Sequence, residues 1–249
     1  MTAMPSFRRL PRWFAVACLA GSGLIPTTAQ PLVEFVPLDV AIPDGDPFGM
    51  SDTVTISGVG PAFRVGEVAV SLDIEGGFNG DLYAQLTHES GFVVLLNRTG
   101  RQSGGDHPFG YADAGFQITL ADTAPADVHQ YRLTLNGSHD TPLGGPLTGA
   151  WQPDGRAVDP ANVGAYDSRT ALFDSFKDLN PNGNWTLYLL DAEAGNEAIL
   201  KSWTLEVTLV PEPAEAALAL GLALLGVAGL ARVRRAATFL EQAEMQGRP

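Results

Sequence analysis

The chain has a single cysteine among its 249 residues, Cys18, and it lies in a segment that we expect to be removed. The mature protein would then contain no disulfide, so burial of apolar side chains must hold it together. About 180 residues are enough for one hydrophobic core. Basic residues are also scarce, because residues 31–213 carry 25 acidic and 8 basic side chains, a balance of −17. This charge argues against nucleic acid as a partner and suits a divalent cation or simple solubility.

The sequence also lacks the motifs of common hydrolases. None of its four histidines, His88, His107, His129 and His139, stands in a setting typical of a serine protease. No Gly-x-Ser-x-Gly sequence occurs, and there is neither a His-x-x-x-His spacing nor a cysteine pair to suggest zinc. We expect the four histidines to lie in surface loops and the chain not to be an enzyme.

The N-terminal end differs in composition from the middle of the chain. Residues 1–29 are typical of a secretory signal, since three arginines precede an apolar stretch at 13–25 and small residues at 27–29 offer a cleavage site. A lipoprotein signal that uses Cys18 is the alternative, but only five apolar residues precede that cysteine. We therefore expect export with removal of this segment.

The C-terminal end has three parts in a fixed order. A prolyl spacer at 211–213 leads into a transmembrane helix at about 214–231, and a basic cluster follows. The prolines favour an extended entry chain, the apolar run is about the length of a short membrane span, and the arginines would stay on the cytoplasmic side. A short tail at 236–249 remains. The residues of this signal are Pro211, Glu212, Pro213, Arg232, Arg234 and Arg235.

The middle of the chain, residues 30–210, predicts an all-β domain. Several short runs alternate apolar and polar residues with the period of a half-buried strand, and Gly- and Asn-containing turns separate them. We expect an antiparallel β-sandwich of jelly-roll type. Residues 92–96 are apolar throughout and predict a central strand, whereas 140–178 predict a long loop that packs Trp151 and Phe173 onto the sandwich. The alternating runs are 68–74, 82–86, 116–120, 131–135, 185–189 and 203–209.

Two tryptophans belong to the last two of these runs. Trp185 and Trp203 each alternate with apolar neighbours, which predicts that both rings are buried in the core. A platform for stacking sugars would instead need these rings at the surface.

Four aspartates in turns or at strand ends are candidate cation ligands: Asp44, Asp46, Asp81 and Asp191. Carboxylate oxygens from turns are ligands that Ca²⁺ prefers, usually six to eight of them. The alternative is that these side chains accept hydrogen bonds from nearby backbone N–H groups and fix the turns. Both interpretations remain open from the sequence.

Short motifs in a fixed order give residues 42–209 a resemblance to a known family. The region resembles the P domain, or P/Homo B domain, of proprotein convertases and of many exported bacterial proteins. The segments that carry the resemblance are IPDGDP at 42–47, GDL at 80–82, SG at 90–91, LLNR at 95–98, PNGNWTL at 181–187 with Asp191, and LKSWTL at 200–205.

The resemblance implies a β-sandwich that accompanies a subtilisin-like serine protease and supports its folding without carrying catalytic residues. The C-terminal segment resembles the PEP-CTERM sorting signal of Gram-negative bacteria, with Pro211-Glu212-Pro213 as its motif. That resemblance implies processing by an exosortase-type membrane enzyme, from an inner-membrane intermediate to the cell surface or the medium. The residues from 236 onwards depart from the pattern, because such signals usually end soon after the basic cluster.

Three functions follow as hypotheses. The first is a non-catalytic module at the cell surface or in the extracellular matrix. The second is an accessory or stabilising partner of a separate exported subtilisin-like protease. The third is binding of a surface polysaccharide, for which the loop aromatics Phe78, Phe109 and Tyr111 are candidates.

Overall fold

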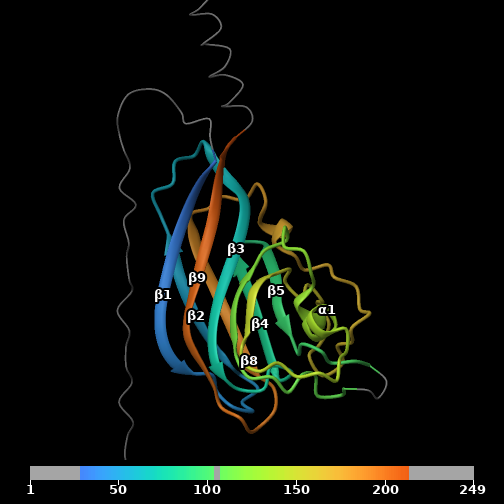
Figure 1. The fold of residues 1–249 in the computed structure, drawn as a ribbon. Helices are drawn as coiled ribbons and strands as arrows, with labels where there is room; N and C mark the ends of the chain where they lie inside the picture. The colour runs from blue at the N-terminus through green and yellow to red at the C-terminus, as the bar shows by residue number, and fades with distance from the viewer. Residues whose placement is uncertain (1–28, 104–106, 213–249) are drawn as a thin grey trace, which may run out of the picture.

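The computed structural model describes residues 29–103 and 107–212, which form two packed β-sheets (Figure 1). This confirms the predicted all-β, two-sheet architecture. The strands are β1 (Gln30–Ala41), β2 (Met50–Ile56), β3 (Phe63–Gly76), β4 (Leu82–His88), β5 (Gly91–Asn97), β6 (Phe116–Leu120), β7 (Leu147–Trp151), β8 (Gly183–Asp191) and β9 (Ala198–Pro211). The described helical elements are the 3-10 turns η1 (Val128–Gln130) and η2 (Phe173–Phe176) and the helix α1 (Tyr131–Asn136).

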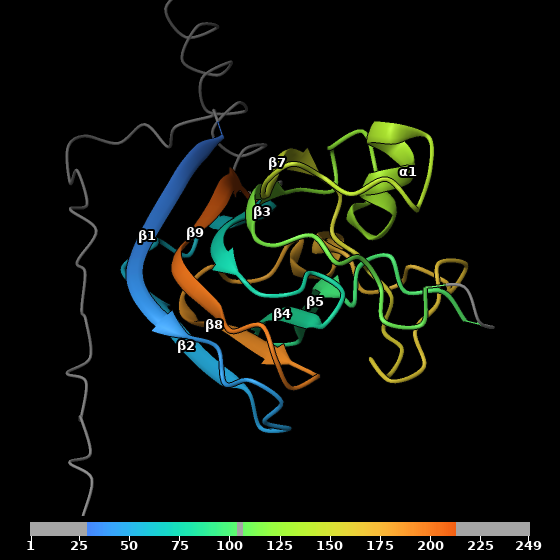
Figure 2. The ribbon, with the colours of Figure 1, turned by 60° about the horizontal axis from the view of Figure 1, so that its bottom comes forward.

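One sheet has five strands in the order β1-β9-β3-β6-β7, and the other has four in the order β2-β8-β4-β5. Figure 2 shows them as two curved layers, with α1 and the long loops gathered on the side away from β1 and β2. The pairs are antiparallel except β6 with β7, which run parallel. The expectation of a wholly antiparallel sandwich is therefore wrong at this one edge.

The sequences of the first two strands lack the regular alternation of apolar and polar residues that predicts a half-buried strand. In β1 the inward residues are only half-buried, while Val33 and Phe35 on the outward side are 56% and 63% exposed. Apolar side chains on both faces hide the period of two. In β2 the sequence MSDTVTI is mostly polar, and its strand is positioned by pairing with β8.

The core lies between the two sheets and contains both tryptophans. Trp185 of β8 is fully buried, and its ring stacks on that of His88 with 3.9 Å between the centroids. Trp203 of β9 is 1% exposed, and its Nε1 donates to Asp52 Oδ2 of β2 at 2.9 Å. Since β9 and β2 belong to different sheets, the Trp203 contact joins the two layers. Aromatic rings of this size supply a large share of the buried apolar area.

The apolar run at 92–96 forms β5, but β5 lies at the edge of its sheet rather than at the centre. Its outer edge is covered by loop backbone, because Asp154 N donates to Leu95 O at 3.0 Å and Val94 N donates to Ala171 O at 3.1 Å. The core and the loops together leave β5 almost completely buried, so its composition is that of a central strand. A single sequence does not show that loops rather than a strand supply the cover.

Residues 131–135 form a helix, not the expected strand. The alternation of Tyr131, Leu133 and Leu135 is too short to separate the two periods, whereas the flanking residues favour a helix. Asp127 caps η1 by accepting from His129 N at 2.9 Å, and Gly137 ends α1 in the left-handed region at φ 69°. Tyr131 is buried, while Leu133 and Leu135 lie 39% and 52% exposed.

The cap of α1 supports a first prediction. Gly137→Ala should destabilise the protein by about 1 kcal/mol, because a Cβ is unfavourable at this positive φ. The cost would be backbone strain alone, since an added Cβ meets no described atom within 4 Å. Chemical denaturation measures the change, and Gly137→Asn should cost less because asparagine tolerates this conformation. Equal losses in the two variants would contradict the assigned cause.

The region 140–178 contains more regular structure than expected. It supplies β7, which pairs with β6, and η2, although the rest is irregular. Trp151 and Phe173 are 5% and 4% exposed and belong to the core cluster. Hydrogen bonds and ion pairs hold much of the remaining loop in place.

Candidate functional site

Three chain segments bring acidic side chains together at one end of the sandwich. Asp191 is the last residue of β8 and continues the inward-facing row of Trp185, Leu187 and Leu189. On one side it pairs with the start of β4 at Leu82, and on the other it forms an isolated bridge with Asp44. The backbone carbonyl of Asp81 accepts from Ala192 N at 2.9 Å, which places Asp81 beside the end of β8.

Asp191 is the most unusual member of this group. It is completely buried, and within 29–103 and 107–212 neither of its carboxylate oxygens has a hydrogen-bond partner. Burial, together with the negative charges of Asp81 and Asp44, raises the pKa of Asp191 to about 7. The nearby Glu193 amide lowers this pKa without completing a hydrogen bond to the carboxylate.

Asp81 shares its environment with one buried cation. Arg98 Nη2 lies 3.3 Å from Asp81 Oδ1, its Nε donates to Gly80 O at 3.0 Å, and its Nη1 lies 3.0 Å from Glu193 Oε1. Burial raises the pKa of Asp81 to about 6, although the Arg98 charge acts in the opposite direction. Below, Asp44, Asp81, Asp191 and Glu193 are called the acidic cluster.

The structure thus brings together three of the four aspartates expected as cation ligands. Asp44 belongs to the cluster, and both of its carboxylate oxygens accept from Gly195 N, at 2.8 and 2.9 Å. Asp46 is exposed and fixes its own turn by accepting from Phe48 N at 2.9 Å, as the structural alternative expected. In the described ranges no three Asp, Glu, His or Cys side chains are arranged to hold a metal ion by themselves.

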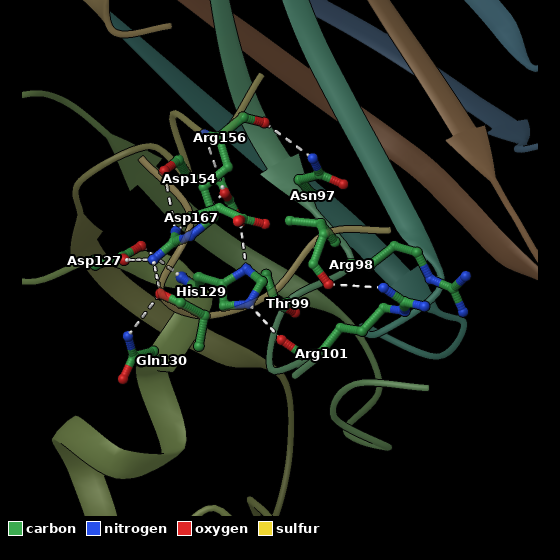
Figure 3. A network of polar contacts seen from close by, with 12 residues as sticks. Asn97, Arg98, Thr99, Arg101, Asp127, His129, Gln130, Asp154, Arg156 and Asp167 are labelled. Carbon is green, nitrogen blue, oxygen red and sulfur yellow. Dashed lines mark hydrogen bonds and ion pairs between the residues drawn. The ribbon is translucent and has the colours of Figure 1, made fainter. Parts of the chain in front are cut away.

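A second polar group, centred on His129, lies beneath the loops (Figure 3). His129 and Asp154 are both fully buried, with Nδ1 2.7 Å from Asp154 Oδ2 and Nε2 2.9 Å from Arg101 O. Both partners are acceptors, so the ring satisfies them only when both nitrogens carry protons. Burial lowers the pKa of His129, but the Asp154 carboxylate raises it by more, and the net shift is upward.

Arg156 extends this network to the neighbouring loop. Its Nη1 lies 3.1 Å from Asp154 Oδ1, and its Nη2 donates to Asp127 Oδ2 at 2.8 Å and to Ala165 O at 2.7 Å. Since Asp154 N also bonds to β5, the network ties the loops at 121–130 and 152–169 to the edge of the four-stranded sheet. Its role is to fix irregular backbone that strands do not hold.

The protonated His129 makes stability depend on pH. A folded-state pKa above 6.5 contributes stability that is complete below pH 6.5 and is lost as the pH rises through the folded pKa. We expect the free energy of unfolding to fall as the pH rises above 6.5 into the alkaline range, and the His129→Gln variant to show a flatter profile. Urea denaturation across this range measures it. Gln130→Ala, a change in the same segment without a titratable group, should keep the wild-type slope, and parallel slopes for His129→Gln and wild type would refute the assignment.

The expectation that all four histidines lie in surface loops is wrong for two of them. His129 is buried as described, and His88 ends β4 at 1% exposure, because its ring stacks on Trp185 and its nitrogens lie 3.0 and 2.7 Å from Asn184 O and Asn180 O. His107 and His139 are half-buried in loops, where His107 Nε2 lies 3.2 Å from Asp140 Oδ1.

The loop aromatics proposed for glycan binding do not form one surface. Phe109 is 61% exposed and Phe78 is half-buried, but Tyr111 is fully buried against Tyr131. Tyr111 must therefore be removed from the candidates. Next to Tyr111, Arg132 forms a buried ion pair with Asp113 and donates to both of its carboxylate oxygens, at 2.7 and 2.9 Å.

The expected sorting motif lies only partly within the described residues. Pro211 ends β9, and Glu212 stays attached to the sandwich through its N–H to Ala62 O at 2.7 Å and its carboxylate to Arg64 Nη2 at 3.2 Å. Pro213, Arg232, Arg234 and Arg235 lie outside the described residues, as do the helix expected at 214–231 and all but the last residue of the secretory signal expected at 1–29. Within the described part of the chain, no helix has the length and apolar character needed to cross a bilayer.

Reasoning from the sequence missed the His129 network altogether. Two local signals were present, a charged pair at Asp127 and His129 and a second at Asp154 and Arg156, each in a segment without periodicity. Charged residues alternating in a Pro- and Gly-rich loop suggest a surface, whereas here they are buried because they are paired with one another.

Comparison with known proteins assigns this chain to no family. No family model matches the sequence, and no curated protein matches it significantly. Among solved structures, the chain is similar to one in the crystal structure of the complex of Aeromonas sobria serine protease and the chaperone, at 17% identity and a TM-score of 0.40. The match covers 74% of this chain and 27% of that chain, and likeness at this level carries no argument about function.

Proposed function

We propose that this chain is a non-catalytic β-sandwich module of jelly-roll type, exported and sorted to the cell surface or extracellular matrix. The strand orders β1-β9-β3-β6 and β2-β8-β4-β5 support the jelly-roll assignment, because the successive strands of this set alternate between the two sheets except at the β4–β5 hairpin. The strand β7 is then an addition at one edge.

The observation that carries the non-catalytic role is the state of the buried histidines. General-base catalysis needs a ring nitrogen that can take a proton from a nucleophile. Both nitrogens of His129 already face oxygen acceptors, and so do both nitrogens of His88. The His129 ring is held between a carboxylate and a backbone carbonyl, and the His88 ring between two backbone carbonyls and the Trp185 ring, which is a structural use of histidine.

The sorting role rests on the sequence of the two ends and on the position of the motif. The last strand runs directly into Pro211 and Glu212, so a cut after the motif would leave every described strand intact. An exosortase-type enzyme would act between the sandwich and the helix expected at 214–231. Release to the cell surface would then leave a complete module.

Mass spectrometry of the protein from membrane, surface and medium fractions tests this proposal. We expect a mature N-terminus near residue 30 and, outside the membrane fraction, a C-terminus close to residue 213. A chain that retains residues 214–249 in every fraction would contradict the sorting role. The same preparations should also be incubated with peptide and ester substrates. We expect no hydrolysis that depends on His129 or His88, so substitution of either residue should leave any background rate unchanged. Stoichiometric co-purification with a serine protease would instead favour an accessory role.

A further inference from the structure

The acidic cluster carries more negative charge than its surroundings balance. Four carboxylates, those of Asp44, Asp81, Asp191 and Glu193, lie near two guanidinium groups, of which only that of Arg98 contacts the cluster and that of Arg101 interacts with Glu193 at longer range. Arg98 forms ion pairs with Asp81 and Glu193. Among the described residues it forms none with Asp44 or Asp191. This imbalance concerns charges near or inside the protein, where water screens them poorly.

Asp191 gives the second, independent observation. Buried carboxylates normally accept two or more hydrogen bonds, because leaving their oxygens without donors costs much of their hydration energy. Here both oxygens lack a donor in the described part of the chain, although the side chain is 0% exposed. The row of inward-facing residues on β8 directs this carboxylate into the end of the sandwich, with Asp44 and Asp81 on the segments to either side. The Asp191 carboxylate is therefore placed where it could coordinate a cation together with its acidic neighbours.

We propose that the acidic cluster binds one hard divalent cation, Ca²⁺, with Asp191 and Asp81 as its central ligands and Asp44 at the rim. Only oxygen donors converge here, which suits Ca²⁺ and not the nitrogen- and sulfur-preferring Zn²⁺. Two carboxylates supply up to four of the six to eight oxygens that Ca²⁺ takes, and backbone carbonyls and water supply the rest. That division is consistent with the absence of a set of three ligating side chains in the described ranges.

The proposed site would be structural, since it joins three separate parts of the chain. Asp44 lies between β1 and β2, Asp81 precedes β4, and Asp191 ends β8. A cation held by Asp81 and Asp191 would lie next to Asp44 at the rim, and so would link the turn at Gly195, whose N–H already bonds to Asp44, to the end of the four-stranded sheet. Binding to the folded state alone raises stability by mass action.

Isothermal titration and thermal unfolding of the purified protein at pH 7.5 test the proposal. With CaCl₂ we expect one ion per chain and, at a concentration about 100-fold above the Kd, a rise in Tm of about 5–10 °C relative to EDTA. Asp191→Asn should abolish the heat of binding and the Ca²⁺-dependent rise. In EDTA its Tm should equal or exceed that of wild type, because the substitution removes a buried negative charge.

Asp46→Asn is the matched control, because Asp46 lies two residues after Asp44 in the same connection between β1 and β2 but accepts a hydrogen bond from Phe48 N in its own turn. It should bind Ca²⁺ as wild type does. The proposal is wrong if wild type shows neither binding nor a shift in Tm, if Asp191→Asn retains both, or if Asp46→Asn loses them equally. An equal effect of MgCl₂ would contradict a site of calcium's size and flexible geometry.

Discussion

Replacing Asp154 with alanine is expected to lower the free energy of unfolding by about 3–5 kcal/mol, because it removes one partner of a buried ion pair and leaves the others uncompensated. Asp154 is 0% exposed and accepts from both His129 and Arg156. Burial raises its pKa, but the charges and hydrogen bonds of these two cations lower it by more, so the carboxylate stays ionised and the folded state depends on it.

Urea denaturation at pH 7 measures this loss, which corresponds to a fall in Tm of about 6–20 °C for a domain of this size. Limited proteolysis should cut first within 121–130 or 152–169, the loops that the network attaches to β5. The control is Asp174→Ala, an exposed aspartate at the start of η2, which should cost at most about 1 kcal/mol. Similar losses in both variants would show that the network stabilises little.

Arg98→Met is expected to cost about 3–5 kcal/mol at pH 8 in EDTA, and much less at pH 5. Arg98 is 4% exposed and is the cation that contacts both Asp81 and Glu193. The pKa values of Asp81 and Asp191 are already raised to about 6 and 7, mainly by burial. Because these pKa values are higher in the folded state than in the unfolded state, folding takes up protons at intermediate pH. The free energy of unfolding therefore declines as the pH rises from about 4 to 7, and the cluster is ionised above that range.

Without Arg98 the ionised cluster loses the cation that contacts it, whereas at pH 5 protons neutralise Asp81 and Asp191 in variant and wild type alike. Denaturation curves at the two pH values measure the difference. Arg64→Met is the control, because Arg64 is half-buried and pairs only with Glu212 among the described carboxylates. It should lose about 1 kcal/mol or less, with little dependence on pH. A loss for Arg98→Met that is the same at pH 5 and pH 8 would contradict the electrostatic explanation.

The sequence predicted those strands whose two faces differ. Alternation marked β3, β4, β6, β8 and β9, since one face of each lies on the core and the other is more polar. It did not mark β1, where Val33 and Phe35 place apolar side chains outward, nor β7, which occupies a Pro- and Gly-rich segment. The helix α1 was mistaken for a strand, because five residues cannot separate a period of two from one of 3.6.

The candidate site could be anticipated only where a residue's type and its turn position agreed. Asp44, Asp81 and Asp191 were singled out on that ground, and the strand pairing places them together. Asp46 has the same type and a similar position, but its side chain serves its own turn. The His129 network could not be anticipated, since its members come from segments that only the packing of the loops on β5 brings together.

The position of β9 constrains when the protein can fold. This last strand lies between β1 and β3, and the first strand pairs with no other described strand. Residues 30–41 therefore cannot pair until residues 199–209 have been synthesised. If the chain crosses a membrane from its N-terminus, residues 199–209 must also have been translocated. Such long-range pairing makes folding slow and delays closure of the sheet. A chain arrested before residue 198 would stay open, which keeps it competent for transport and accessible to proteases until it is complete.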